Sequence, residues 1–363
     1  MKILYHTPVP LNPSSSVGCG IRPIKMLKAF EEIGCDVTVI AGYGAERQRA
    51  IDNIKRNLSK GIKYDFCYSE SPPLPTLLTE QHRFPVYPFL DFNFFKFLKK
   101  ESVPIALFYR DIYWLVGAPP KEWSRLKNSI ANFFYRYDLD KYSRLVDILY
   151  LPTMKMGNYL KNIPDQRKKA LPPGLTLFSN SFVPVVPPNS LKLLYVGGMG
   201  ESYKMHEIFR ALEFAEAEFT LCTRINEWAS VRKEYIPYIN DKVKVVHKSG
   251  GELDELYDSN NIAILFMEPN EYREFAAPLK LYEYLGRFKP IIATEGTHAA
   301  TFVKENGIGW VIEYKSSALV DLLLYLSSHP DEIIKAASRC RDIAESHTWI
   351  ARARQVINDL GKS

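Results

Sequence analysis

The hydrophobic and polar positions at the start of the chain follow the pattern of one βαβ unit. Residues 2–6 (KILYH) predict a buried strand, and a loop rich in proline, serine and glycine runs from residue 8 to 20. Apolar residues then recur at helical spacing over 24–33, Gly34 stands where a C-cap glycine belongs, and residues 36–40 (DVTVI) predict the next strand. This order is typical of a parallel sheet.

The same alternation continues and starts again after a segment over 180–190 that carries three prolines and no helical period. The sequence therefore predicts an α/β chain with an N-terminal domain over 1–179, a linker over 180–190, a second domain over 191–345 and a closing segment over 346–363. The predicted elements are strands over 64–68, 103–108, 147–151, 191–196, 219–222, 243–247, 262–266 and 290–294, a glycine turn over 197–200, and helices over 124–144, 207–217 and 279–285.

Composition places the chain among ordinary soluble globular proteins. Of its 363 residues 46% are hydrophobic and 24% are charged, which excludes wholesale disorder. No apolar run reaches the roughly 18 residues of a membrane span, and the N-terminus does not resemble a secretory signal. Five scattered cysteines, an odd number, argue against a disulfide framework, and no Cys-x2-Cys pair indicates zinc. We expect a cytoplasmic protein.

Charge is distributed unevenly along the chain. The net charge of +6 divides into +10 over residues 1–180 and −4 over residues 181–363. A basic half indicates an anionic partner, either phosphate, nucleic acid or a lipid surface, or else a solvated basic face. No RNA-binding motif is present, so we expect no nucleic-acid partner.

Both predicted domains carry glycines after their first strand, where backbone N–H groups commonly face a phosphate. Gly18-Cys-Gly20 lacks the third glycine of Gly-x-Gly-x-x-Gly, and Gly197-Gly-Met-Gly200 has a different spacing. Each segment by itself fits a tight turn as well as a ligand loop.

The segment from Pro278 to Thr294 (PLKLYEYLGRFKPIIAT) resembles the Pro-x-Lys-x-x-Glu-Tyr…Lys-Pro-Ile-Ile-Ala stretch of retaining GT-B glycosyltransferases of family 4. Four other segments agree with this family in the expected order, namely 147–153, 171–174, 257–265 and 346–349. The resemblance implies two Rossmann-like parallel-sheet domains that face each other across a cleft, with a closing helix that returns to the first domain. It also implies transfer of a sugar from a nucleotide diphosphate sugar, UDP- or GDP-linked, with retention and without a metal or another cofactor.

In the second domain, the resemblance implies that Glu283, at the start of a helix, holds the ribose and that Lys280 points to the diphosphate. The Glu-x7-Glu pattern of the family requires a carboxylate at position 275, eight residues before Glu283. This chain has Phe275 there, and Glu274 is one residue away. The arginine usual after the first strand is also absent, since Gly198 or Met199 stands there. We expect three residues to complete the donor site: Arg224, which also has a catalytic role, Lys204, and Gly198 of the glycine turn.

In the first domain, we expect Gly18 and Gly20 to bring backbone toward the donor phosphate or the acceptor. Asp111 either takes part in catalysis, by accepting a proton from the acceptor or binding the donor sugar, or caps a helix. Arg110 is expected to face anionic substrate. Asp138-Leu-Asp140 resembles a metal-binding Asp-x-Asp, but we interpret it as solvated helix surface and expect no metal site.

Two stretches mix aromatic and basic residues, at 91–100 and 127–136. They fit either helices packed on the sheet or helices that lie on an anionic bilayer. We therefore expect a glycan or lipid-linked acceptor, in polysaccharide or glycoconjugate synthesis, and peripheral contact with the inner face of the membrane. Two alternatives stay open: a catalytically degenerate homologue that serves as a partner subunit, and a nucleotide-sugar epimerase on the same fold.

Overall fold

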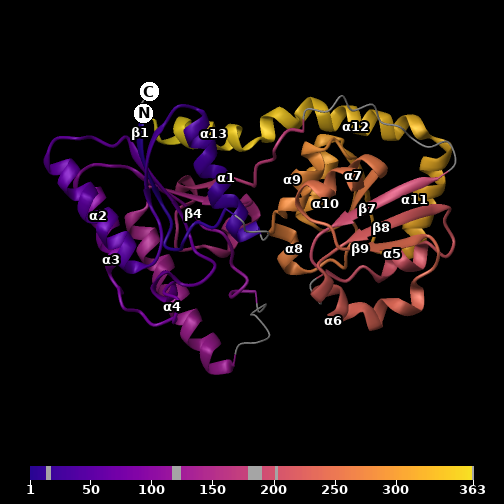
Figure 1. Cartoon of the computed structure of the whole chain (residues 1–363), viewed down its shortest axis with the longest axis horizontal. Coiled ribbons are helices and arrows are strands. Elements are labelled where there is room, and N and C mark those ends of the chain that lie inside the picture. Colours follow the sequence, from indigo (N-terminus) through magenta and orange to yellow (C-terminus); the bar gives the residue numbers. More distant parts are fainter. Residues whose placement is uncertain (14–17, 117–123, 179–189, 201–202, 362–363) are drawn as a thin grey trace. The chain divides into compact units, whose positions relative to one another are not determined.

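The computed structural model describes residues 1–13, 18–116, 124–178, 190–200 and 203–361 (Figure 1). The chain forms two compact units, one of Met1–Gly174 with Trp349–Ser363, and one of Leu175–Thr348. The predicted linker over 180–190 lies outside the described residues except for Ser190.

Unit 1 is built on a six-stranded parallel sheet in the order β2-β1-β3-β4-β5-β6. The strands are almost wholly buried except at β2, as expected for a parallel sheet covered by helices. The strands are β1 (Lys2–His6), β2 (Asp36–Ile40), β3 (Phe66–Glu70), β4 (Ile105–Phe108), β5 (Ile148–Leu151) and β6 (Lys168–Ala170), and the helices are α1 (Gly18–Glu32), α2 (Gly44–Ser59), α3 (Leu90–Lys100), α4 (Arg125–Leu145) and α13 (Trp349–Leu360).

Unit 2 repeats this plan with a second six-stranded parallel sheet in the order β12-β11-β10-β7-β8-β9. Its strands are β7 (Leu191–Val196), β8 (Ala217–Cys222), β9 (Val243–Val246), β10 (Ile262–Leu265), β11 (Ile291–Thr294) and β12 (Gly309–Ile312). Its helices are α5 (His206–Ala211), α6 (Ile225–Tyr235), α7 (Leu253–Ser259), α8 (Glu271–Phe275), α9 (Leu279–Gly286), α10 (His298–Asn306), α11 (Ser316–Ser328) and α12 (Pro330–Ala344).

The strand order reverses direction once in each sheet. In unit 1 the chain moves outward from β1 to β2 on one side and from β3 to β6 on the other. In unit 2 the reversal lies between β7 and β10. The carboxyl ends of the strands at such a reversal are where open α/β sheets bind ligands, so these two edges are the first places to look for a site.

The α/β class and most predicted strands are confirmed, and strands 2–6, 36–40 and 191–196 have the predicted bounds. Three predictions are wrong in detail. The strand expected over 64–68 lies at Phe66–Glu70, because its register follows Ile3 on β1. The helix expected over 207–217 ends at Ala211, because Ala217 already pairs with Leu191 as the first residue of β8. The loop expected to reach residue 20 ends earlier, since α1 begins at Gly18.

The aromatic residues of α3 do not form a membrane-facing surface. Phe92, Phe94, Phe95 and Leu98 are buried, whereas the lysines of this helix lie on its exposed side. The alternative that this helix packs its aromatic face on the protein is therefore the correct one for residues 91–100. The stretch over 127–136 differs, because Ile130 and Phe133 on α4 are exposed.

A buried polar network joins the carboxyl ends of β1 and β3 to α2 and α3. The His6 ring lies between Ser69 Oγ, 2.8 Å from Nδ1, and Asp91 Oδ1, 2.9 Å from Nε2. Arg47 donates to both carboxylate oxygens of Asp91, at 2.9 and 3.1 Å. Although Ser, His and Asp stand in the order of a hydrolase triad, all three are at most 3% exposed, so this network is structural.

Asp91 balances the charge of this network. Burial by itself would raise the pKa of Asp91, but hydrogen bonds from His6 and the charge of Arg47 outweigh it and lower the pKa. The carboxylate is therefore ionised at neutral pH, and its removal would leave the Arg47 guanidinium buried without a counter-charge.

We predict that Asp91→Ala lowers the free energy of unfolding by about 3–5 kcal/mol, the usual cost of breaking a buried ion pair from one side. Urea denaturation followed by circular dichroism measures this change. The matched control is Asp52→Ala, which removes an exposed carboxylate from α2. If both substitutions lowered the free energy of unfolding equally, the buried network would contribute no more to stability than an exposed carboxylate.

Candidate functional site

The glycine turn after β7 lies against the first turn of α9 in unit 2. A Cβ at Gly197 would overlap Lys280 Nζ, so any larger residue there would displace the end of the lysine side chain. Lys280 Nζ donates to the Tyr195 hydroxyl at 2.5 Å, and that hydroxyl donates to the carbonyl of Gly198 at 2.7 Å. The turn and the lysine are thus held together at the reversal between β7 and β10.

The ammonium of Lys280 lies against two aromatic rings and is partly buried. It lies 4.2 Å from the centre of the Tyr195 ring and 4.7 Å from that of Tyr203. Burial, followed by the positive charge of Arg273, lowers the pKa of Lys280 to about 7, although Glu283 acts in the opposite direction. Near neutral pH, this lysine is poised between its charged and neutral forms.

Arg273 on α8 supplies a second cation to the same cluster. Its guanidinium lies 5.2 Å from the centre of the Tyr203 ring, so Tyr203 contacts both cations. Burial also lowers the pKa of Arg273. Two cations brought together against one ring repel each other, and an anionic ligand would relieve that repulsion. This cluster can therefore bind a phosphate or diphosphate.

A carboxylate from α6 fixes the other side of the glycine turn. Glu227 Oε2 accepts a hydrogen bond from the N–H of Met199 at 3.0 Å, and Glu227 forms an ion pair with Arg224. Arg224 is the N-cap residue of α6 and about half exposed. The structure therefore brings Arg224, Gly198 and Lys280 to one turn, as the sequence predicts.

Glu283 lies on the same helix as Lys280, three residues further on, and is partly buried. The expectation that it stands at the start of a helix is wrong, since α9 begins at Leu279 and Glu283 is in its second turn. Phe275 is 1% exposed and belongs to the core, so position 275 has a packing role. Glu274 precedes it at the end of α8.

Lys204 is not part of this cluster of hydrogen bonds. Its Nζ lies 3.7 Å from a carboxylate oxygen of Glu268, and both side chains are about half exposed. Its role in donor binding stays a prediction.

In unit 1, Gly18 and Gly20 lie in the first turn of α1. Two residues further on, Arg22 is buried, with Nε 3.1 Å from Glu70 Oε1 and its guanidinium stacked 3.4 Å from the centre of the Phe108 ring. Arg22 thus secures α1 to the sheet, whereas the role of the two glycines in phosphate or acceptor binding stays a prediction.

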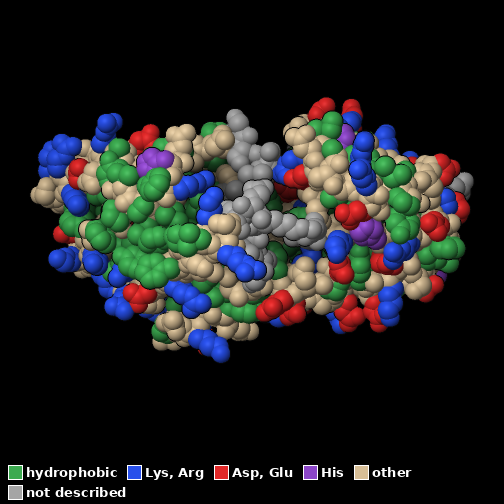
Figure 2. All heavy atoms as spheres, turned by 90° about the horizontal axis from the view of Figure 1, so that it is seen from below, with side chains coloured by type: hydrophobic (Ala, Val, Ile, Leu, Met, Phe, Trp, Pro, Cys, Tyr) green, Lys and Arg blue, Asp and Glu red, His purple; other side chains and the backbone are tan. Residues whose placement is uncertain are grey.

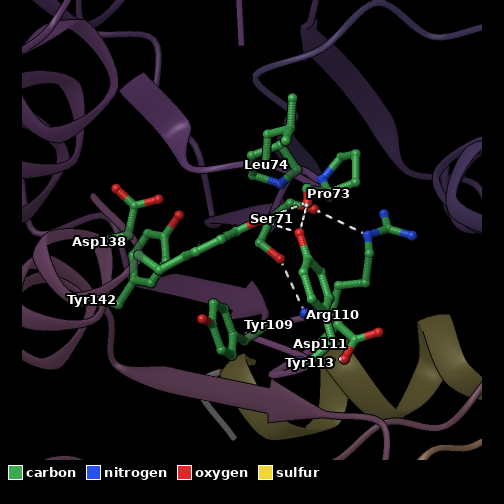
Figure 3. A pocket seen from close by; sticks show the side chains of 11 residues that line it. Ser71, Pro73, Leu74, Tyr109, Arg110, Asp111, Tyr113, Asp138 and Tyr142 are labelled. Carbon is green, nitrogen blue, oxygen red and sulfur yellow. Dashed lines mark hydrogen bonds between the residues drawn. The ribbon is translucent and has the colours of Figure 1, made fainter. Parts of the chain in front are cut away.

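Asp111 lines a cavity of about 160 Å³ at the carboxyl ends of β3 and β4 (Figure 3). Its Oδ1 accepts hydrogen bonds from the N–H groups of Ile112 and Tyr113, at 2.7 and 3.0 Å. Asp111 therefore caps a turn rather than a helix. Arg110 lines the same cavity, but its guanidinium is engaged with the carbonyl of Ser71 at 3.3 Å and with Glu70 at 3.6 Å.

The interpretation of Asp138 as solvated helix surface is wrong. Asp138 is 2% exposed, lines the same cavity and accepts a hydrogen bond from the N–H of Thr76 at 2.7 Å. Burial raises its pKa to about 7. It faces inward because α4 packs against the segment after β3 on this side. Asp140, by contrast, forms an ion pair with Arg144 on the outer side of α4.

Sequence reasoning missed Arg273, Tyr203 and Asp138. Arg273 lies on α8, between β10 and α9, and its contact with the Tyr203 ring, which no local sequence pattern reveals, brings it to the cluster. Within the described part of the chain, no group of three or more His, Cys, Asp or Glu residues is arranged to hold a metal ion. No helix among the described residues has both the length and the apolar character needed to cross a membrane.

Comparisons with known proteins establish the fold. No protein-family model matches the chain, and no curated protein matches it. Among solved structures, the chain is similar to Anabaena HepE in complex with UDP, with 12% identity, 99% of each chain covered and a TM-score of 0.67. It is also similar to sucrose-phosphate synthase from Thermosynechococcus elongatus (14% identity, 98% and 97% covered, TM-score 0.68) and to WaaG, a glycosyltransferase involved in lipopolysaccharide biosynthesis (12%, 100% of both, 0.59). The chain has the GT-B fold of two Rossmann-like domains.

We predict that Lys280 is acylated at neutral pH far more readily than exposed lysines, because its pKa of about 7 leaves much of it neutral and nucleophilic. Labelling with a trace of acetic anhydride between pH 5 and 10, read by mass spectrometry, gives a titration midpoint for each lysine. Lys335, whose pKa is raised by Glu332 and Asp331, serves as the control. A midpoint for Lys280 near 10 would contradict the assignment.

Proposed function

We propose that the chain is a glycosyltransferase that moves a sugar from a nucleotide diphosphate sugar, UDP- or GDP-linked, to a glycan or glycolipid acceptor with retention. The observation that carries this proposal is the pair of cations, Lys280 and Arg273, on one Tyr203 ring, with Lys280 against the glycine turn at the reversal of a parallel sheet. The proposed role is in the synthesis of a cell-surface polysaccharide or glycoconjugate.

The site chemistry suits a nucleoside diphosphate. Lys280 and Arg273 provide positive charge for the diphosphate, the turn at Gly198 provides backbone N–H groups, and Glu283 on the same face of α9 accepts hydrogen bonds from the ribose hydroxyls. HepE, a protein of the same fold, has been solved in complex with UDP, which supports the proposal that this chain binds a nucleotide. Arg224 completes the site from the N-terminus of α6.

The proposed reaction breaks the bond between the anomeric carbon and the diphosphate oxygen. The acceptor oxygen forms its bond to the same face of the anomeric carbon, and its proton passes to the departing phosphate. Lys280 and Arg224 stabilise the charge that develops on that phosphate, which is where preorganised cations contribute most. Asp111 orients the acceptor hydroxyl. No protein nucleophile and no additional cofactor take part in this scheme.

We also propose that unit 1 contacts an anionic membrane surface. Figure 2 shows a broad hydrophobic area on unit 1 with Lys and Arg side chains around it. Large exposed apolar side chains of unit 1 concentrate in two segments, at Phe84, Val86 and Phe89 and, one turn apart along α4, at Leu126, Ile130 and Phe133. Exposed basic residues accompany both segments, at Arg83, Arg125, Lys127 and Arg136.

We predict that Glu283→Ala weakens UDP binding about tenfold to a hundredfold, since it removes hydrogen bonds to a charged group while the fold is kept. Isothermal titration with UDP, GDP and their glucose and mannose derivatives measures this effect. Glu305→Ala, on the exposed side of α10, is the matched control. Unchanged affinity in Glu283→Ala would remove the ribose assignment, and binding without turnover on any acceptor would favour a degenerate partner subunit.

We predict that the double substitution Leu126→Ser and Phe133→Ser reduces binding to vesicles that contain phosphatidylglycerol by at least fivefold, because two exposed apolar side chains no longer enter the interface. Co-sedimentation at fixed salt gives the bound fraction. The control is Phe214→Ser, an equally exposed phenylalanine in unit 2. If the unsubstituted chain does not bind these vesicles, the membrane proposal is wrong.

A further inference from the structure

One carboxylate joins the glycine turn after β7 to the start of α6. Glu227 stands in the first turn of α6, where a glutamate commonly reaches back to the backbone N–H of the N-cap residue. Its Oε2 instead accepts a hydrogen bond from the N–H of Met199 at 3.0 Å. A Cβ on Gly198 would lie 3.2 Å from the same oxygen, so the carboxylate lies directly over the turn.

The other partners of Glu227 are cations of the candidate donor site. Glu227 Oε1 accepts a hydrogen bond from the guanidinium of Arg224, with which it forms an ion pair. Burial lowers the pKa of Lys280 to about 7, and among the charges that act on this lysine Glu227 raises its pKa whereas Arg224 lowers it. The negative charge of Glu227 therefore acts on both cations.

These partners are the ones that a diphosphate requires. Phosphate oxygens, like carboxylate oxygens, are held by backbone N–H groups and by guanidinium and ammonium groups. A backbone N–H is a single donor, so the Met199 N–H cannot serve Glu227 and a phosphate oxygen fully at the same time. A phosphate that binds at this turn must therefore displace the carboxylate.

The carboxylate is free to leave the turn at little cost. The side chain of Glu227 is 30% exposed and that of Arg224 is 49% exposed. Ion pairs that are open to water to this extent contribute little to stability. Rotation of Glu227 into water would release the Met199 N–H and the Arg224 guanidinium together, and both could then turn to a ligand.

We infer that Glu227 is an internal competitor of the donor: its carboxylate occupies the place of one phosphate and is displaced when the diphosphate binds. This inference rests on the proposed function and adds a regulatory contact to the same site. The competitor lowers the affinity for the nucleotide sugar and for the nucleoside diphosphate product alike, because either ligand binds only after Glu227 has left. It thereby favours release of the product.

The test compares Glu227→Gln with the unsubstituted chain by isothermal titration with inorganic pyrophosphate and, separately, with UDP and GDP. Glutamine keeps the size of the side chain and an acceptor for the Met199 N–H, but it removes the charge that attracts Arg224 and repels phosphate. We expect pyrophosphate and the nucleotide that binds to bind Glu227→Gln about threefold or more tightly. Pyrophosphate that binds neither form, or binds Glu227→Gln no more tightly, would overturn the inference.

Glu234→Gln is the matched control, because it removes the same charge from an exposed position of the same helix. It should bind pyrophosphate as the unsubstituted chain does. An equal gain in affinity in both variants would reflect the net charge of unit 2 rather than competition at the turn, and it would overturn the inference.

An experimental structure of the unsubstituted chain with pyrophosphate keeps the inference testable if Glu227→Gln does not fold. A phosphate oxygen should accept the hydrogen bond from the Met199 N–H, with Glu227 turned away from the turn. Pyrophosphate bound while Glu227 still accepts from that N–H, or bound at another place, would overturn the inference.

The two kinds of probe separate this inference from the proposed function. If UDP or GDP binds but Glu227→Gln changes neither nucleotide nor pyrophosphate affinity, only the competitor is refuted. If pyrophosphate binds more tightly to Glu227→Gln while neither nucleotide binds to either form, the competitor is supported and the proposed function is refuted. If no anion binds to either form, both are refuted.

Discussion

The contact between the Lys280 ammonium and the glycine turn after β7 is the constraint on which the candidate donor site depends. The turn passes so close to the lysine that a side chain at Gly197 would displace the ammonium, and Tyr195 bridges the turn and the lysine with hydrogen bonds. This arrangement partly buries the ammonium and places it on the same Tyr203 ring as the Arg273 guanidinium. The repulsion between the two cations is relieved when an anion binds. The same contact that shapes the turn therefore favours binding of a diphosphate.

The parallel sheets explain why such a contact can form. The chain changes direction between β7 and β10, so the segments that follow these two strands emerge at the same edge and supply the turn and α9. In unit 1, the segments after β3 and β4 meet α4 in the same way and enclose Asp138. In each unit, segments that follow neighbouring strands therefore meet at the carboxyl edge of the sheet. They bring together cations in unit 2, and tyrosines and carboxylates in unit 1.

The sequence was sufficient to predict most of the strands, although it missed β6 and β12, and the structure brings Lys280, Gly198 and Arg224, which the sequence singled out, together around one turn. Their positions follow from local patterns, because each stands at the carboxyl end of a strand or in the first turn of a helix. Asp138 could not be predicted, since a helix of mixed polarity does not reveal which side faces the sheet. Arg273 was missed for a related reason: only the packing of α8 against Tyr203 brings it to Lys280.

The Lys280 cluster is proposed to bind the diphosphate of a nucleotide sugar. The most direct measurement is an experimental structure of the chain with UDP-glucose, or with whichever nucleotide sugar binds best. We predict that diphosphate oxygens lie within about 3 Å of Lys280 Nζ and of the Arg273 guanidinium, with the ribose at Glu283. A nucleotide bound elsewhere, with water or a protein carboxylate at Lys280 instead, would contradict it.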